Sequence, residues 1–163
     1  MTFRIGHGYD VHAFCDGDHL MLAGIRVPYQ YSVVAHSDGD VVIHALCDAL
    51  LGALALGDIG DHFPDTDARY KNVSSTVLLK KAYELITLKE YSLVNTDITV
   101  IAQAPKIAPY KYTMRSHIAN AICMPIDVIS IKATTTEKLG FIGRGEGIAA
   151  SAVVLLEKHP STS

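Results

Sequence analysis

The chain has 163 residues, 49% hydrophobic and 19% charged, which is typical of a compact globular protein and not of a disordered one. A formal net charge of −3 argues against the basic surface of a nucleic-acid-binding protein. Three cysteines, Cys15, Cys47 and Cys123, form no CxxC pair and indicate reduced thiols in the cytoplasm. The most apolar run, residues 41–56, is too short to cross a bilayer, and no signal-peptide pattern precedes it. We therefore expect a single domain over residues 1–163, with no nucleic-acid or membrane partner.

In chain order, the first predicted elements are extended. Residues 2–9 predict a short strand, and HLMLAGIRVPY around Gly24 predicts a hairpin. A buried helix is predicted over residues 38–56, which Ser37 or Asp38 can cap and Gly57 can end. The later predicted elements are a serine-capped helix over 74–89, a strand over 92–104, a helix over 111–123, a strand over 127–136, a glycine-rich connection over 137–147 and a strand over 148–158.

This order predicts an α+β fold with one mixed four-stranded sheet, helices on one face of the sheet, and a small hairpin beside it. The opposite face of such a sheet needs cover. Self-association is the simplest way to supply it, because a symmetric oligomer buries the same surface of every copy.

Acidic and histidine side chains gather in two of these segments. Side chains two apart in a strand share a face, so Asp10 and His12 point the same way. Asp40, His44 and Asp48 recur every four residues and form one stripe on the buried helix. Burying such groups without partners would cost roughly 1–3 kcal/mol each, so something must satisfy them.

Two interpretations of this stripe remain open. In the first, His44 joins a buried polar network by bonding to one of its two flanking aspartates. In the second, Asp10, His12 and His44 are the protein ligands of a catalytic zinc ion, whose fourth position is open to substrate. Either aspartate would then orient the imidazole ring from behind. Cys47 lies near His44 in the sequence but is expected to pack as a small apolar side chain.

The loop DIGDHFPDTD concentrates four aspartates. Two of them are expected to cap turns, which is an ordinary role of aspartate in loops. The others can accept hydrogen bonds from the hydroxyls of a polyol or a ribose. The four residues are Asp58, Asp61, Asp65 and Asp67.

Two further polar or rigid segments follow predicted strands. Residues 102–109, AQAPKIAP, are either a plain strand exit or a rigid backbone suited to the edge of a nucleobase. Residues 132–147, KATTTEKLGFIGRGEG, combine the hydroxyls, amides and basic groups of a phosphate site with a carboxylate that can hold Mg²⁺. The alternative for this segment is a threonine-rich strand end followed by a surface loop. The sequence contains neither a Walker-type P-loop nor a GxSxG elbow.

Four stretches together resemble one family, the 2-C-methyl-D-erythritol 2,4-cyclodiphosphate synthases of the non-mevalonate isoprenoid pathway. They are RIGHGYDVHAF, AHSDGDVVIHALCDALLGALALGDIGDHFPDTD, AQAPK and KATTTEKLGFIGRGEGIA, and they span residues 4–150. The resemblance implies a phosphorus–oxygen lyase that converts 4-diphosphocytidyl-2-C-methyl-D-erythritol 2-phosphate to 2-C-methyl-D-erythritol 2,4-cyclodiphosphate and CMP. In that reaction the 2-phosphate attacks the β-phosphorus of the same molecule. The protein then needs neither a nucleophile nor a general base of its own.

The resemblance also implies two metal ions. Zinc, one ion per subunit, would be held by Asp10, His12 and His44, with a substrate phosphate oxygen as its fourth ligand. A second ion, Mg²⁺ or Mn²⁺, would bridge the phosphates and be held by Glu137. This division suits an intramolecular attack, because positioning can lower a barrier by roughly 7–11 kcal/mol and two metal ions can stabilise the attacking and leaving oxygens.

The remaining implied site residues contact the substrate. His36 and Thr135 would stabilise the transition state, and His36 with Ser37 would contact phosphate. Strict alternation places Thr135 on the opposite strand face from Thr134 and Thr136, so the strand ends or bulges there, or Thr135 acts through its backbone. The other positions, in the methylerythritol pocket, the cytosine loop and the cytidine diphosphate site, are Asp58, Ile59, Gly60, Phe63, Pro64, Asp65, Thr66, Asp67, Ala102, Gln103, Ala104, Pro105, Lys106, Ile107, Ala108, Thr134, Thr136, Phe141 and Arg144.

The resemblance further implies a homotrimer with active sites between subunits. One chain would supply zinc and the polyol pocket, and its neighbour would supply much of the cytidine pocket. On the threefold axis it implies a cavity for an isoprenoid diphosphate near Tyr9, Arg144 and Glu146. Arg144 could thus serve the cavity or catalysis.

Two other functions would use the same residues. A zinc-dependent phosphodiesterase acting on a cytidine diphosphate compound would share the ligands, need a base to activate water and release a linear phosphate. A trimeric protein that binds isoprenoid diphosphates would hold zinc as a structural ion and release no CMP. The reaction products therefore separate the three functions.

Overall fold

A mixed five-stranded sheet forms the centre of the computed structural model, which describes residues 2–64 and 73–159. The strands are β1 (Phe3–Asp16), β4 (Tyr31–Val33), β5 (Tyr91–Ile101), β6 (Ile129–Thr134) and β7 (Gly147–Lys158), in the order β4-β1-β7-β5-β6. The β5–β6 pair is parallel, and the other neighbouring pairs are antiparallel. The predicted hairpin is confirmed as β2 (His19–Leu22) and β3 (Ile25–Pro28).

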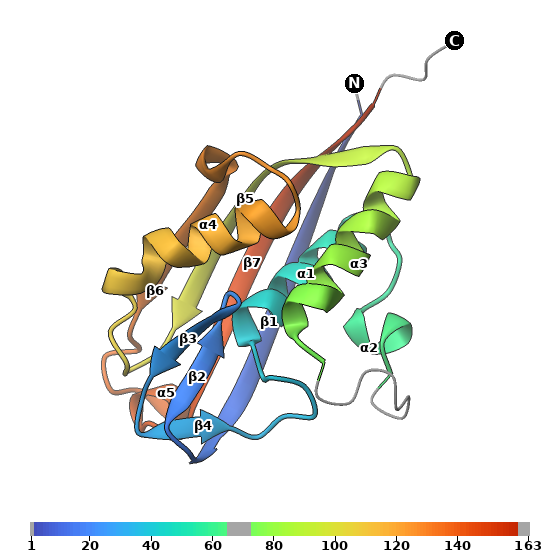
Figure 1. Ribbon diagram of the computed structural model, residues 1–163. Coiled ribbons are helices and arrows are strands. Elements are labelled where there is room, and N and C mark those ends of the chain that lie inside the picture. Colours follow the sequence, from blue (N-terminus) through green and yellow to red (C-terminus); the bar gives the residue numbers. More distant parts are fainter. Residues whose placement is uncertain (1, 65–72, 160–163) are drawn as a thin grey trace.

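Three helices lie on one face of this sheet, as expected from the sequence (Figure 1). They are α1 (Val41–Ala53), α3 (Ser75–Leu88) and α4 (Lys111–Ala121). Two short helices, α2 (Ile59–His62) and α5 (Gly140–Gly143), and the 3₁₀ turns Ala108–Tyr110 and Ile126–Val128 lie in connections. Strands and helices share one hydrophobic core, to which α1 contributes almost its whole length. Among the described helices, none is both long and apolar enough to cross a membrane.

The prediction of four strands in the sheet was wrong. Strand β4 has only three residues, too few to show an alternating pattern, and it forms by pairing with Phe14 to Asp16 at the end of β1. Strand β1 itself runs well past the predicted end at residue 9, because β7 pairs with it as far as Ala13. Both differences come from long-range hydrogen bonds that local patterns do not reveal.

The start of α1 also differs from the prediction. The helix begins at Val41, and its cap is Asp40 in place of Ser37 or Asp38. Asp40 is completely buried, and its carboxylate accepts hydrogen bonds from the backbone of Val42 and Ile43 at 3.1 and 3.0 Å. The same carboxylate accepts from the backbone N–H groups of residues 23 and 24, at 2.9 and 2.6 Å. It therefore ties the hairpin turn to the start of the helix.

Two glycines of β1 allow α1 to lie directly on the strand. A Cβ atom on Gly6 would lie 1.9 Å from the carbonyl oxygen of Ala49, and one on Gly8 would lie 1.9 Å from that of Ala45. Any side chain there would hold the helix away from the strand. Because side chains two apart in a strand share a face, Asp10 and His12 follow Gly6 and Gly8 on the face of β1 that contacts α1.

The opposite face of β1 is exposed and mostly apolar, with His7 as a polar member. Ile5, Tyr9 and Val11 alternate with the buried glycines, and their side chains are 72%, 49% and 43% exposed. Val153 of the paired strand β7 extends the same face, because it stands opposite His7 in the register. Exposed apolar surface of this kind is typical of an interaction site. The homotrimer that would cover it remains a prediction.

Candidate functional site

Three of the predicted ligands converge where β1 meets α1. His44 Nδ1 lies 3.0 Å from Asp10 Oδ2, His12 Nε2 lies 3.0 Å from the same oxygen, and the two ring nitrogens are 3.2 Å apart. A tetrahedral zinc ion with bonds of about 2.0–2.1 Å holds its ligand atoms about 3.3 Å apart. The spacing and chemistry of the three groups therefore fit one divalent metal ion.

The surroundings of Asp10 favour its ionised form. Burial opposes ionisation of Asp10, but hydrogen bonds from His12 and His44 outweigh it and hold the pKa of this carboxyl well below its usual range. Burial also disfavours the charged form of His44, yet its hydrogen bond to Asp10 raises the pKa of the imidazole above its ordinary value of 6.5. A permanent carboxylate beside two imidazoles is an attractive environment for a cation.

The far side of the His44 ring is held by residues that were not predicted for this role. His44 Nε2 lies 2.9 Å from Ser75 Oγ, and Ser75 in turn donates a hydrogen bond to Asp38. The expectation that Asp40 or Asp48 would bond to the His44 ring was wrong. Asp40 is engaged at the helix start, and Asp48 accepts a hydrogen bond from the backbone of residue 59 at 2.8 Å.

Sequence spacing could not reveal this partner, because Ser75 lies 31 residues from His44 along the chain. Its one signal is its place at the start of a predicted helix, where serine ordinarily serves as a cap. Cys47 behaves as expected. It is completely buried in the core, and burial raises the pKa of its thiol well above the ordinary value, so it stays a neutral packing group.

A cavity of about 680 Å³ opens beside the two histidines. Several residues predicted to contact the substrate line it together with His12 and His44, namely His36, Ser37, Ile59, Gly60, Phe63 and Pro64. Its apolar walls were missed, because single Val, Ala and Leu residues carry no sequence signal for binding. These are Val34, Ala35, Val73 and Leu78.

The acidic loop has the capping role that was expected for two of its aspartates. Asp58 caps α2 by accepting from the backbone N–H of Asp61 at 3.0 Å, and Asp61 accepts from that of Asp58 at 3.2 Å. Asp48 anchors the same short helix to α1 through its bond to Ile59. The predicted contacts Asp65, Thr66 and Asp67 lie outside the described residues.

The predicted cytidine segments meet at the ends of the parallel strands β5 and β6. The backbone N–H of Ala102 donates to the carbonyl of Thr134 at 3.0 Å, which joins the 102–108 loop to the threonine segment. Strand β6 ends at Thr134, and this removes the conflict over the face of Thr135. Thr135 Oγ1 donates to Glu137 Oε1 at 3.2 Å, so the predicted magnesium ligand lies beside the predicted catalytic hydroxyl.

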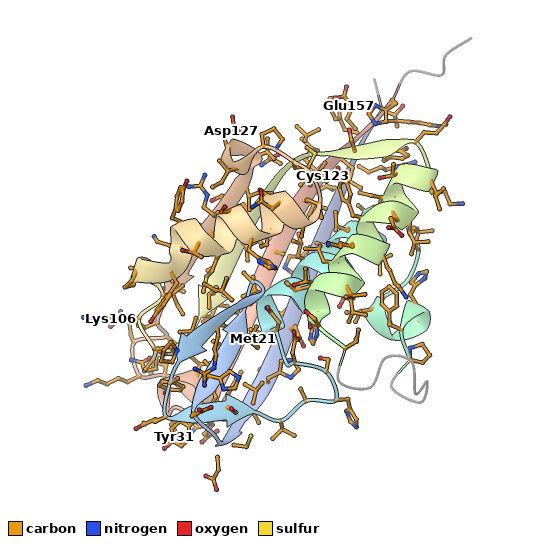
Figure 2. All side chains as sticks on the ribbon, in the orientation of Figure 1. Met21, Tyr31, Lys106, Cys123, Asp127 and Glu157 are labelled. Atoms are coloured by element: carbon orange, nitrogen blue, oxygen red, sulfur yellow. The ribbon has the colours of Figure 1, made fainter. Side chains whose placement is uncertain are left out.

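Within one chain, these two groups of residues lie apart. Figure 2 shows Lys106 of the 102–108 loop near the β6 edge of the molecule, on the opposite side from α2, which borders the cavity. Phe141 lies in α5, and Arg144 follows that helix and pairs with Glu146 through an Nε–Oε1 contact of 2.6 Å. Neither belongs to the cavity of the metal ligands, and Tyr9 projects from the exposed face of β1.

The whole arrangement matches a known family. The sequence model of the YgbB family covers residues 3–157. The chain belongs to this family. Among similar proteins, the 2-C-methyl-D-erythritol 2,4-cyclodiphosphate synthase of Saccharophagus degradans is 60% identical over 154 residues, which are 94% of this chain and 99% of that protein. The synthase of the same name from Thioalkalivibrio sulfidiphilus is 58% identical over 156 residues, 96% of this chain and 98% of that protein.

Solved structures with this fold extend the likeness. The bifunctional IspDF of Campylobacter jejuni is 46% identical with a TM-score of 0.94, covering 99% of this chain. This chain matches only 44% of that longer protein. IspF of Plasmodium falciparum in complex with CDP is 37% identical with a TM-score of 0.86, and the match covers 97% of each chain.

Proposed function

We propose that this protein converts 4-diphosphocytidyl-2-C-methyl-D-erythritol 2-phosphate to 2-C-methyl-D-erythritol 2,4-cyclodiphosphate and CMP. The observation that carries the proposal is the convergence of Asp10, His12 and His44 at the edge of a large cavity in a member of the YgbB family. In the reaction, a 2-phosphate oxygen forms a bond to the β-phosphorus. The bond from that phosphorus to the bridging oxygen breaks, and CMP leaves with the electron pair.

The residues near the cavity suit this reaction. Zinc held by Asp10, His12 and His44, with Mg²⁺ or Mn²⁺ held by Glu137, would supply Lewis acids that withdraw charge from the phosphate oxygens. His36 and Ser37 line the cavity beside the histidine ligands, where their side chains can orient the attacking phosphate. The apolar walls of the cavity would enclose the methylerythritol carbons, and Asp58 would accept hydrogen bonds from the substrate hydroxyls.

We propose that the complete site forms between two subunits of a homotrimer. The metal ligands and the cytidine segments occupy different sides of one chain, so a neighbouring chain has to bring the second group to the first. The exposed apolar face of β1 and β7 offers the contact surface. Gln103 Oε1 in the cytosine loop is buried without a hydrogen-bond partner among the described residues, which leaves an acceptor for a ligand or a neighbour.

Two further features of the family resemblance remain proposals. An isoprenoid diphosphate would lie on the threefold axis, where Tyr9 supplies apolar surface and the exposed Arg144–Glu146 pair supplies charge. The cytoplasm is the proposed location, and the three free cysteines suit a reducing compartment.

Phosphorus NMR of the products tests the proposed reaction. With the substrate, zinc and magnesium, we expect one cyclic diphosphate and one equivalent of CMP. A linear phosphate product would identify a phosphodiesterase instead. Absence of CMP release, with zinc bound, would identify a binding protein.

A further inference from the structure

A chain of hydrogen bonds behind His44 determines which of its ring nitrogens carries the hydrogen. Ser75 is completely buried, and its Oγ lies 2.9 Å from His44 Nε2. Its hydroxyl donates to Asp38 Oδ1, while its backbone N–H donates to Asp38 Oδ2 at 2.9 Å. Both carboxylate oxygens of Asp38 therefore bind the same serine.

Counting hydrogens gives the direction of the next bond. A serine hydroxyl has one hydrogen, and here a carboxylate, which only accepts, takes it. Ser75 Oγ can then only accept from the imidazole, so His44 Nε2 carries a hydrogen. Without a metal ion, Nδ1 can also carry a hydrogen, which it donates to Asp10 at 3.0 Å. When a metal ion takes the place of that hydrogen, the hydrogen on Nε2 leaves the Nδ1 lone pair for the ion.

We propose that Asp38 and Ser75 are positioning residues that hold His44 in its Nε2–H tautomer and so keep Nδ1 available to the metal ion. This inference rests on the proposed metal site. Neither residue touches the three ligand atoms, and both act through the His44 ring. Partners of this kind fix ring orientation and tautomer at metal sites.

The positions of the two residues in the fold explain how the relay is built. Asp38 precedes α1, and Ser75 is the first residue of α3, so the relay joins the starts of two neighbouring helices. Ser37 Oγ also lies 3.2 Å from His44 Nε2, and it accepts from the backbone of Gly39 at 3.2 Å. It is a second, longer acceptor for the same hydrogen.

The first experiment compares Ser75→Ala with Ser74→Ala. Both changes remove a hydroxyl from the start of α3, but Ser74 caps the helix through the backbone of Thr76 at 3.3 Å. Zinc affinity is measured by competition with a chromophoric chelator. Ser75→Ala should weaken zinc binding by roughly 10–100-fold, as loss of an outer partner typically does. The zinc affinity of Ser74→Ala should stay within about twofold of that of the unchanged protein. Loss of the helix cap in this variant should lower only the stability of the fold.

A double-variant cycle tests whether the two residues act together. Asp38→Asn places an amide N–H where the N–H and O–H of Ser75 need acceptors, so alone it should weaken zinc binding by a factor similar to that of Ser75→Ala. The double variant should bind no more weakly than the worse single variant. Effects that multiply would overturn the relay.

Nitrogen NMR of His44 in the zinc-loaded protein reads the relay directly. In the unchanged protein, Nε2 should carry a hydrogen that exchanges slowly with water, and in Ser75→Ala this hydrogen should exchange at least tenfold faster. Equal exchange rates in the two proteins, or an Nε2 without a hydrogen in the unchanged protein, would overturn the inference. If the unchanged protein binds no zinc, the proposed metal site fails, whatever the tautomer. If it binds zinc and the two serine variants bind equally well, the relay fails and the metal site stands.

Discussion

At the scale of single residues, His44 links the helix to the strand ligands. It is the one ligand of the three that comes from α1, and both of its ring nitrogens have partners. Its Nδ1 faces Asp10 and His12, and its Nε2 faces Ser75. Substitution of this side chain therefore tests the metal site with little effect on the backbone around it.

We predict that His44→Ala abolishes turnover and leaves a folded trimer. Loss of a ligand should lower zinc affinity by more than the roughly 10–100-fold that loss of an outer partner costs. Asp48→Asn is the matched control on the same helix, since the amide oxygen can still accept from Ile59. Zinc content, CMP release and circular dichroism check both variants. Near-normal activity of His44→Ala would exclude it as a ligand.

The pKa shifts of Asp10 and His44 predict how the metal-free protein responds to pH. A raised pKa in His44 means that this group stabilises the fold below about pH 6.5, and the contribution is lost as pH rises through the raised value. A lowered pKa in Asp10 adds stability that is lost only when pH falls below its ordinary range.

Zinc should remove the alkaline part of this dependence, because the bound ion replaces the proton on His44. Melting temperatures across neutral pH, with and without zinc, measure the effect. Metal-free protein should lose stability with rising pH, and the zinc-loaded protein should gain relative to it. Parallel curves would contradict the assignment of His44.

At the scale of elements, the contact between β1 and α1 places the ligands. We predict that Gly8→Ala destabilises the protein by about 3 kcal/mol or more and weakens zinc binding, because its Cβ would lie 1.9 Å from a backbone oxygen of the helix. Gly52→Ala is the control within α1. A Cβ there meets nothing within 4 Å, and alanine should stabilise the helix by up to about 1 kcal/mol. Urea unfolding measures both changes, and equal stabilities would contradict the close packing.

At the scale of the whole molecule, the exposed face of β1 predicts the assembly. The side chain of Ile5 is 72% exposed on this face. The substitution Ile5→Glu should give folded monomers, because burying an unpaired carboxylate between subunits is costly. The control is Leu88→Glu at the end of α3, where a side chain 79% exposed lies away from that face. Light scattering after gel filtration distinguishes the two. A trimeric Ile5→Glu would exclude this face as the interface.

Complementation between inactive chains tests whether the active site is shared. His44→Ala removes a zinc ligand from the half of the site that holds Asp10, His12 and His44. Glu137→Ala removes the predicted magnesium ligand from the other half, which holds the cytidine segments. Co-assembled at equal amounts, the two chains should recover roughly one quarter of full activity, because one of the three sites in each mixed trimer then combines two intact halves. No recovery would place both halves in one chain.

Local patterns in the sequence were enough for much of the fold. The serine-capped helix α3 and the hairpin β2–β3 were predicted close to their observed bounds, because capping, periodicity and turn chemistry act over a few residues. The spacing of Asp10 and His12, and the position of His44 on a buried helix, already suggested a metal site. Family resemblance then supplied the reaction.

Tertiary structure decided what depends on contacts between distant residues. The short strand β4 exists only by pairing with β1, and Asp40 caps α1 while it holds the hairpin turn, 16 and 17 residues away. Ser75, and neither flanking aspartate, holds the far side of His44. A buried polar group takes whichever partner the packed chain brings within hydrogen-bond distance. The backbone N–H groups of residues 42, 43 and 59 already occupy the two aspartates, so the imidazole of His44 pairs with a serine from another helix.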